Sequence, residues 1–162
     1  MAEDNGLTRL CCRQTAIGMI GIAESGGVVT NLYFMEKSGD RSAETAGTPL
    51  LDEAFRQFDA WLEGRIRTFT LPIAADGTAF AQRVWRALLE IPYGDTASYG
   101  EIATLIGVPG ASRAVGSACR RNPLPIFIPC HRVVCSDGGI GGYLGGTEIK
   151  QRLLDIERRD SE

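Results

Sequence analysis

The sequence predicts an α+β protein of two domains, one over residues 1–75 and the other over residues 76–162. Three observations support this expectation. β-Compatible segments gather in the first half of the chain, helical periods fill the second half, and Ala74-Ala75-Asp76-Gly77 has the composition of a boundary. A length of 162 residues with 44% hydrophobic side chains is sufficient for two small cores.

The first half predicts a sheet with one helix. We expect strands over residues 7–14, 16–23, 28–34 and 66–73, the last of them ended by Pro72. Gly26-Gly27 is a turn signal before the third strand, and residues 38–47 form a polar loop. Apolar residues then recur at helical spacing from Leu50 to Leu62, which predicts a helix.

The second half predicts helices. We expect them over residues 80–89, 98–106, 111–121 and 147–159. Ser98 and Glu101 have the spacing of a capping box, which starts the second helix, and Gly107 ends it. The short connection Val108-Pro109-Gly110 leads into the third helix, and two short helices joined in this way predict a helix-turn-helix.

The helix over 111–121 has two different faces. Arg113, Ser117 and Arg120 fall on one stripe, flanked by Gly116 and Arg121. The opposite side carries the small or apolar residues Ala111, Val115, Ala118 and Cys119. Such a helix can approach a nucleic-acid groove closely while its arginines project toward phosphates. An ordinary surface helix with exposed arginines is the alternative.

The charge distribution favours the nucleic-acid interpretation. The net charge of −3 lies in the first 75 residues, which carry seven basic and ten acidic side chains. No acidic residue occurs between Glu101 and Asp137, whereas Arg113, Arg120, Arg121 and Arg132 do. We interpret this stretch as an electrostatic footprint for a phosphate backbone, with a solvated basic loop as the alternative.

Composition also excludes several classes of protein. No apolar run approaches the ~20 residues of a membrane span, and the N-terminus lacks the apolar core of a signal peptide, so we expect a cytoplasmic protein with no membrane partner. His131 is the only histidine, which rules out a histidine-rich metal centre. The adjacent Cys11 and Cys12 lack the spacing of structural zinc sites and predict small buried residues of a strand.

The segment after the third helix holds the candidate active site. Asn122-Pro123-Leu124-Pro125 bends the chain, and a short apolar run leads to Cys130 and His131. Cysteine reacts as the thiolate, and a neighbouring base promotes that form. Glu157 lies within the apolar arc of the last helix, where a carboxylate needs a partner. We expect His131 to be this partner. The alternatives are Lys150, which lies near the same side of that helix, and a Glu157 that is solvated at the frayed end of the helix.

The run Ile128-Pro129-Cys130-His131-Arg132-Val133-Val134 closely resembles the active-site signature of the O6-alkylguanine-DNA alkyltransferases. The resemblance extends from about Phe80 to Glu157. It includes Val84-Trp85, Ile91-Pro92-Tyr93-Gly94, Ser98-Tyr99-Gly100-Glu101, Ser112-Arg113-Ala114-Val115-Gly116, Arg121-Asn122-Pro123 and Gly142-Tyr143. It implies a small ribonuclease-H-like α/β domain followed by a mainly helical repair domain that contains the helix-turn-helix.

The resemblance also implies a reaction and a set of catalytic residues. Cys130 would accept the alkyl group from guanine O6 in one displacement and keep it. His131 would act as the base through a water, with Glu157 orienting it. Asn122 would brace the turn that carries the cysteine, and Tyr99 would give a hydrogen bond to N3 of the leaving guanine. We therefore expect a monomer that works without a cofactor. The single histidine rules out the histidine-containing structural zinc site that some relatives carry in their first domain, so we also expect no metal.

The same resemblance implies residues that contact DNA. Arg113 would enter the base stack in place of the flipped nucleotide. Small residues would let the helix lie close to the minor groove of double-stranded DNA, unlike most helix-turn-helix proteins. The residues expected at the DNA or the guanine pocket are Arg113, Ala114, Gly116, Ser117, Arg120, Val133, Tyr143 and Leu144. Val133 and Leu144 would read the guanine edge through backbone groups.

Some features depart from the family pattern or stay unassigned. Leu144 stands where many members have a small or polar residue, which affects the pocket size. Cys135 is a second thiol near Cys130, expected to be packed or neutral, and Cys119 is expected in the core. Three rival functions remain: a damage-binding protein without transfer, a helix-turn-helix regulator with a redox cysteine, and a cysteine hydrolase. An acceptor cysteine that reacts once distinguishes the alkyltransferase from all three.

Overall fold

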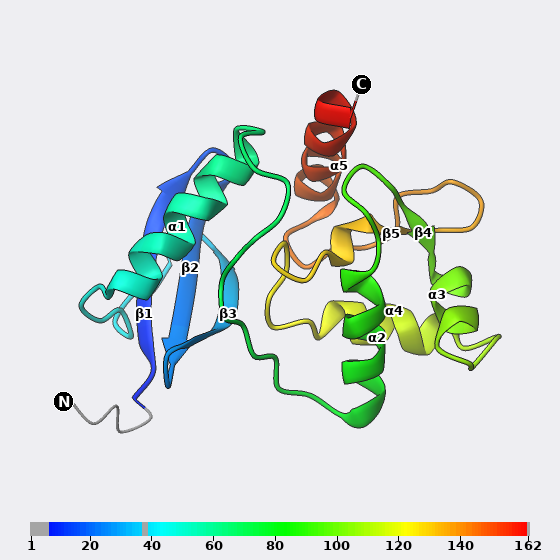
Figure 1. The fold of residues 1–162 in the computed structure, drawn as a ribbon, viewed down its shortest axis with the longest axis horizontal. Helices are drawn as coiled ribbons and strands as arrows, with labels where there is room; N and C mark the ends of the chain where they lie inside the picture. The colour runs from blue at the N-terminus through cyan, green and yellow to red at the C-terminus, as the bar shows by residue number, and fades with distance from the viewer. Residues whose placement is uncertain (1–6, 37–38, 162) are drawn as a thin grey trace. The chain divides into compact units, whose positions relative to one another are not determined.

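The structure is a computed structural model that describes residues 7–36 and 39–161. The chain forms two compact units, Met1–Ala75 and Asp76–Glu162. Figure 1 shows the sheet of the first unit and the helices of the second. None of the described helices is both long and apolar enough to cross a membrane.

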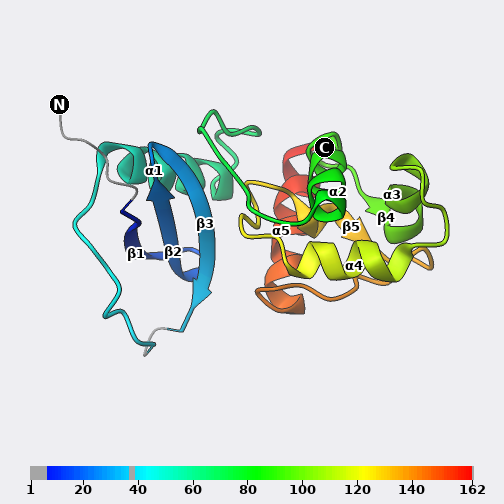
Figure 2. The same cartoon turned by 90° about the horizontal axis from the view of Figure 1, so that it is seen from below.

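The first unit is a three-stranded antiparallel sheet with one helix. Its strands are β1 (Arg9–Thr15), β2 (Gly18–Ser25) and β3 (Val28–Met35), in the order β1-β2-β3. Helix α1 (Pro49–Leu62) lies along one face of the sheet, as Figures 1 and 2 show. Thr48 caps this helix, because its side chain accepts a hydrogen bond from the amide of Leu51.

The core of this unit lies where the sheet and α1 meet. Apolar residues recur at every second position of a strand and about every 3.6 positions of the helix, so each element has one apolar face. Ile20, Ile22 and Leu32 point from the strands and are buried, as are Phe55 and Phe58 from α1. The first three of the four expected strands and the helix are confirmed within a few residues. Position 38 of the predicted polar loop lies outside the described residues.

The predicted strand over 66–73 is wrong. The structure has only an isolated bridge between Val29 and Ile73, flanked by hydrogen bonds of Val29 to the Pro72 carbonyl and of Ala74 to the Val29 carbonyl. Pro72 has no amide hydrogen to donate to a ladder. The amide of Thr70 instead bonds the side chain of Gln57 at 2.9 Å. The segment therefore follows α1 and the sheet without extending the sheet as a full strand.

The second unit contains four α-helices among the described residues. They are α2 (Ala79–Leu89), α3 (Tyr99–Leu105), α4 (Ser112–Arg120) and α5 (Thr147–Ser161). All four match the helices expected from periodicity to within three residues. The Ser98 hydroxyl accepts from the Glu101 amide at 3.0 Å, which confirms the predicted cap of α3.

Three short elements of this unit were not predicted. Strand β4 (Ala97–Ser98) pairs in parallel with β5 (Val133–Val134), and a 3-10 turn, η1 (Cys130–Arg132), lies directly before β5. All three elements are too short to carry a periodic signal. The pairing brings the start of α3 next to the segment that follows Cys130.

Candidate active site

Helix α4 has the two faces that the sequence predicts. Val115, Ala118 and Cys119 are buried, whereas Arg113 and Arg120 are exposed. The indole nitrogen of Trp85 in α2 donates to the Ala118 carbonyl at 3.0 Å and fixes the buried face. Ala114 and Arg121 are exposed and Ser117 is half-buried. Gly116 lies against the ring of Tyr99, which a Cβ at that position would meet at 3.7 Å.

Asn122 holds the bend that follows α4. Its side-chain amide donates to the Ile128 carbonyl at 2.9 Å, and its carbonyl oxygen accepts from the Leu124 amide at 2.9 Å. The side chain is buried, so both bonds form away from water. Between these anchors, Ile126 has a φ of 76°, a left-handed conformation that is rare outside glycine. The two hydrogen bonds of Asn122 therefore hold the turn that leads to Cys130 in this conformation.

Cys130 begins η1, and its side chain is buried. Burial raises the pKa of this thiol to about 11, while the hydrogen bond from Asn122 and the positive charge of Lys150 act in the opposite direction. The group is therefore a thiol at neutral pH. A nearby base must take its proton before it can attack as a thiolate.

His131 and Glu157 form a buried pair behind this cysteine. Nε2 of His131 and Oε2 of Glu157 lie 2.5 Å apart, and both side chains are almost completely excluded from solvent. Burial lowers the pKa of His131, and Glu157 opposes that effect. Burial alone would raise the pKa of Glu157, but the hydrogen bonds and charges of His131 and Arg132 outweigh it and lower the pKa. The site thus holds a neutral imidazole beside an ionised carboxylate.

Lys150 has a different role from the one considered from the sequence. Its ammonium donates to the Val133 carbonyl at 2.6 Å and to the Gly142 carbonyl at 3.2 Å. It also lies 5.8 Å from the centre of the Tyr99 ring. Lys150 therefore ties β5 to the segment before α5, whereas Glu157 is bound by His131 and Arg132.

Arg132 corrects the sequence interpretation of the basic stretch. Its side chain is buried and its Nε donates to Glu157 at 2.9 Å. It therefore does not contribute to a phosphate-binding surface. The exposed cations of that stretch are Arg113, Arg120 and Arg121.

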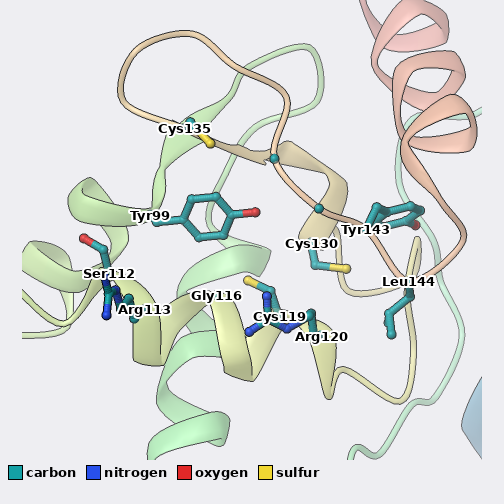
Figure 3. A pocket seen from close by; sticks show the side chains of 12 residues that line it. Tyr99, Ser112, Arg113, Gly116, Cys119, Arg120, Cys130, Cys135, Tyr143 and Leu144 are labelled. Atoms are coloured by element: carbon teal, nitrogen blue, oxygen red, sulfur yellow. The ribbon is translucent and has the colours of Figure 1, made fainter.

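A pocket of about 400 Å³ opens in front of the cysteine. Figure 3 shows its twelve lining residues, which come from α3, α4, η1 and the segment after β5. The sequence-predicted residues that line it are Tyr99, Arg113, Gly116, Arg120, Cys130, Tyr143 and Leu144. Asn122, His131 and Glu157 are buried around it, while Ala114 and Ser117 lie elsewhere on α4 and Val133 is buried in β5. Leu144 is 43% exposed.

Sequence reasoning missed five residues of the pocket wall. They are Ser112, Cys119, Cys135, Gly141 and Gly142. Gly141 has a positive φ of 75°, a conformation that favours glycine. Of these five residues, it is the one whose residue type could have indicated a special backbone position. Cys119 is buried as expected, and burial raises its pKa to about 12, but it also lines the pocket. Within the described part of the chain, no cluster of three histidine, cysteine or carboxylate side chains could hold a metal ion.

Replacing Gly141 with alanine is expected to lower the free energy of unfolding by about 1–2 kcal/mol, since an L-residue is strained at this φ. Its Cβ would also lie 2.8 Å from the Tyr99 hydroxyl, so Tyr99 must shift. Gly142→Ala is the matched control, because nothing lies within 4 Å of a Cβ there. Urea unfolding followed by circular dichroism measures both variants, and equal stabilities would contradict the prediction.

A comparison with protein families identifies the class to which the second unit belongs. The family model described as 6-O-methylguanine DNA methyltransferase, DNA binding domain, matches residues 79–159. This range contains α4, the pocket and the Cys130, His131 and Glu157 side chains. The second unit is thus a domain of this DNA-binding class.

Full-length relatives then identify the family. The constitutive methylated-DNA–protein-cysteine methyltransferase of Bacillus subtilis is 44% identical over 152 residues, which cover 90% of this chain and 92% of the relative. The crystal structure of Mycobacterium tuberculosis O6-methylguanine methyltransferase superposes with a TM-score of 0.87 at 40% identity, covering 96% of each chain. The M. tuberculosis protein in complex with DNA gives a TM-score of 0.83 at 42% identity, covering 94% of this chain and 93% of that one. This chain belongs to the methylated-DNA–protein-cysteine methyltransferase family.

Proposed function

We propose that this protein repairs O6-alkylguanine in DNA by moving the alkyl group onto Cys130 in a single turnover. The observation that carries the proposal is one arrangement of side chains. A buried cysteine faces a pocket, and a histidine–carboxylate pair lies next to it. The relatives whose names state this activity match the chain over most of its length. The protein is therefore an enzyme that is consumed by its reaction.

The reaction needs no cofactor, because the substrate carries its own leaving group. His131 takes the Cys130 proton through a water, and the sulfur attacks the alkyl carbon on guanine O6. A carbon–sulfur bond forms while the carbon–oxygen bond breaks, and its electron pair goes to the guanine. The product guanine regains a proton, and the thioether is too stable to release the alkyl group.

Tyr99 is proposed to assist the leaving guanine. It lines the pocket, and burial, with a contribution from the nearby thiols, raises its pKa to about 12. The phenol therefore keeps its proton at neutral pH and can donate a hydrogen bond to N3 as negative charge builds there. Tyr143 and Leu144 form another part of the wall, with backbone groups of Val133 and Leu144 as candidates to read the guanine edge.

We propose that α3 and α4 act as a helix-turn-helix on the minor groove. Arg113 and Arg120 are exposed on α4, and both also line the pocket. Ala114, Gly116 and Ser117 have small side chains that allow close approach to the groove. O6 of guanine is enclosed in a duplex, so the nucleotide must leave the stack, with Arg113 filling the vacancy. Phosphate contacts would dominate, since repair must accept any flanking sequence.

We further propose a fold for the first domain, an oligomeric state and a cellular location. The three-stranded sheet with α1 is consistent with a small ribonuclease-H-like domain. One chain supplies the pocket, the nucleophile and the base, which supports action as a monomer. All five cysteines are free thiols, and a thiol acceptor needs the reducing environment of the cytoplasm.

Mass spectrometry after mixing the protein with duplex DNA containing O6-methylguanine tests this function. We expect one added methyl on the Cys130 peptide, restored guanine and no further turnover. A protein that stays unmodified but binds the damaged duplex would support damage recognition without repair. Release of product over many cycles would support a hydrolase.

Arg113→Ala is expected to slow repair of duplex DNA by about 10-fold or more, since unstacking a base costs a few kcal/mol that the arginine offsets. Reaction with free O6-benzylguanine should change by less than about threefold, because no base pair is broken. Single-turnover rates on both substrates give the comparison. Arg158→Ala, an exposed arginine on α5, is the control. Equal losses on the two substrates would contradict the base-flipping role.

A further inference from the structure

Arg132 is a buried arginine whose guanidinium makes several polar contacts. Its Nε donates to both carboxylate oxygens of Glu157, at 2.9 and 3.1 Å, and its Nη1 donates to the Ile91 carbonyl at 2.7 Å. The guanidinium also lies 5.7 Å from the centre of the Tyr93 ring. The side chain is 9% exposed, so these contacts form in a largely dry environment. Arg132 is thus held rigidly against the carboxylate that also binds His131.

The charges of this cluster balance in one protonation state. Glu157 supplies one negative charge and accepts from His131, from Arg132 and from the Gly94 amide at 2.9 Å. Arg132 supplies one permanent positive charge at the same carboxylate. The buried Glu157–Arg132 pair is therefore neutral when His131 is neutral. A proton added to His131 leaves the cluster with a net positive charge in a medium that solvates it poorly.

Other groups around His131 do not replace Arg132 in this balance. Helix α5 presents Glu157 and Lys150, and η1 presents Cys130 and Arg132. The segment after α2 contributes the Tyr93 ring against Arg132. The described buried residues of α2 are apolar: Ala81, Val84, Trp85, Ala87 and Leu88. Lys150 donates to two backbone carbonyls, whereas the guanidinium of Arg132 forms an ion pair with Glu157.

We propose that Arg132 is a positioning residue that neutralises Glu157 and thereby keeps His131 in the neutral form that can accept the Cys130 proton. The inference deepens the proposed alkyl transfer and rests on it for its catalytic meaning. With Nε2 donating its proton to Glu157, the lone pair of the imidazole is on Nδ1. The base can take a proton only while that nitrogen is deprotonated.

Without Arg132, the pair of His131 and Glu157 would hold one extra proton at neutral pH. The imidazolium would pair with the carboxylate, or the carboxyl would become protonated and leave the histidine proton on Nδ1. In both forms Nδ1 already carries a proton. The base would be blocked even though every atom of Cys130, His131 and Glu157 is present. The protonation state of His131 therefore distinguishes a role of Arg132 in the charge balance from a role in packing alone.

Nuclear magnetic resonance of the single histidine tests the proposal directly. His131 is the only histidine of the chain, so untagged protein with ¹⁵N-labelled histidine gives one imidazole spectrum. In the wild type we expect a neutral ring at pH 7, with the proton on Nε2. In Arg132→Gln we expect protonation of Nδ1 at pH 7 and a titration midpoint raised by at least about one pH unit, a tenfold change in proton affinity.

Two further variants control for charge and packing. Arg132→Lys keeps the positive charge with a different shape, so its midpoint should stay within about half a pH unit of the wild type. Arg158→Gln removes an exposed arginine next to Glu157 in the sequence and should leave the midpoint unchanged. An Arg132→Gln protein that is folded, by its dispersed spectrum, and has a wild-type midpoint would overturn the proposal. So would an imidazolium at pH 7 in the wild type, which needs no variant.

The pH dependence of transfer gives the second readout. In Arg132→Gln the acidic limb of the single-turnover rate should move to higher pH by the same amount as the imidazole midpoint, with the rate recovering above that midpoint. A uniform loss at all pH values, with an unchanged midpoint, would show a purely structural role and overturn the inference. If the wild type transfers no alkyl group at all, the proposed function fails, while the imidazole spectra still decide the charge balance.

Discussion

Cys130→Ala is expected to accept no methyl group from DNA containing O6-methylguanine, while its affinity for that duplex stays within about threefold of the wild type. The sulfur of Cys130, the proposed acceptor atom, is the only heavy atom that the substitution removes from the pocket. In the proposed complex, phosphate contacts from exposed arginines would supply most of the affinity, and the substitution leaves these arginines in place. Intact-protein mass and a gel-shift titration at fixed salt measure the two quantities.

Cys135→Ala is the matched control, because Cys135 lines the same pocket and is partly exposed. It should take up one methyl on the Cys130 peptide at a rate within about threefold of the wild type. Methyl transfer to Cys130→Ala, at Cys119 or Cys135, would move the acceptor to another thiol. Loss of DNA binding in Cys130→Ala would show that the variant had disturbed the turn held by Asn122.

Glu157→Gln is expected to lower the free energy of unfolding by about 3 kcal/mol and the transfer rate by about 100-fold or more. The substitution leaves the buried Arg132 without its ion pair. In the proposed mechanism it also removes the negative charge that stabilises an imidazolium during proton transfer. Urea unfolding and single-turnover mass spectrometry measure the two effects. Glu148→Gln, an exposed position in the first turn of α5, should change stability by less than about 0.5 kcal/mol.

The stability difference between wild type and Glu157→Gln should depend on pH. The pKa of Glu157 is lowered in the folded protein, so its ionised form stabilises the fold at pH values above the ordinary carboxyl pKa. The difference should be complete from about pH 5 upward and shrink as the pH falls through the acidic range, where the folded carboxyl becomes protonated. A difference that grows toward low pH would contradict the ion pair.

Much of the local structure could be predicted because it depends on short-range patterns. The cap of α3 at Ser98 and the two faces of α4 follow from residues within a few positions of one another. The strand expected over 66–73 failed because β-propensity says nothing about which hydrogen-bond partners are available. Thr70 bonds Gln57, and Pro72 cannot donate.

The candidate site also combines features that the sequence predicts with features that it does not. The reactive pair Cys130 and His131 and the unusual carboxylate Glu157 could be identified from the sequence, since a charged residue in an apolar arc requires a partner. The identity of all its partners could not. Arg132 looked like one cation of a DNA-binding stretch, and Lys150 looked like a possible partner of Glu157. The structure assigns both residues other roles, since Arg132 binds Glu157 and Lys150 binds two carbonyls.

The sequence by itself determined the family, the acceptor candidate and most helices, because motifs and periodicity are encoded by neighbours along the chain. Only the tertiary structure decided which charges are buried together, which residues enclose the pocket and that β4 pairs with β5. Those features join segments far apart in sequence: Glu157 is 25 positions from Arg132 and 63 from Gly94. The state of a buried base depends on every charge that the fold brings near it, and no local pattern contains that sum.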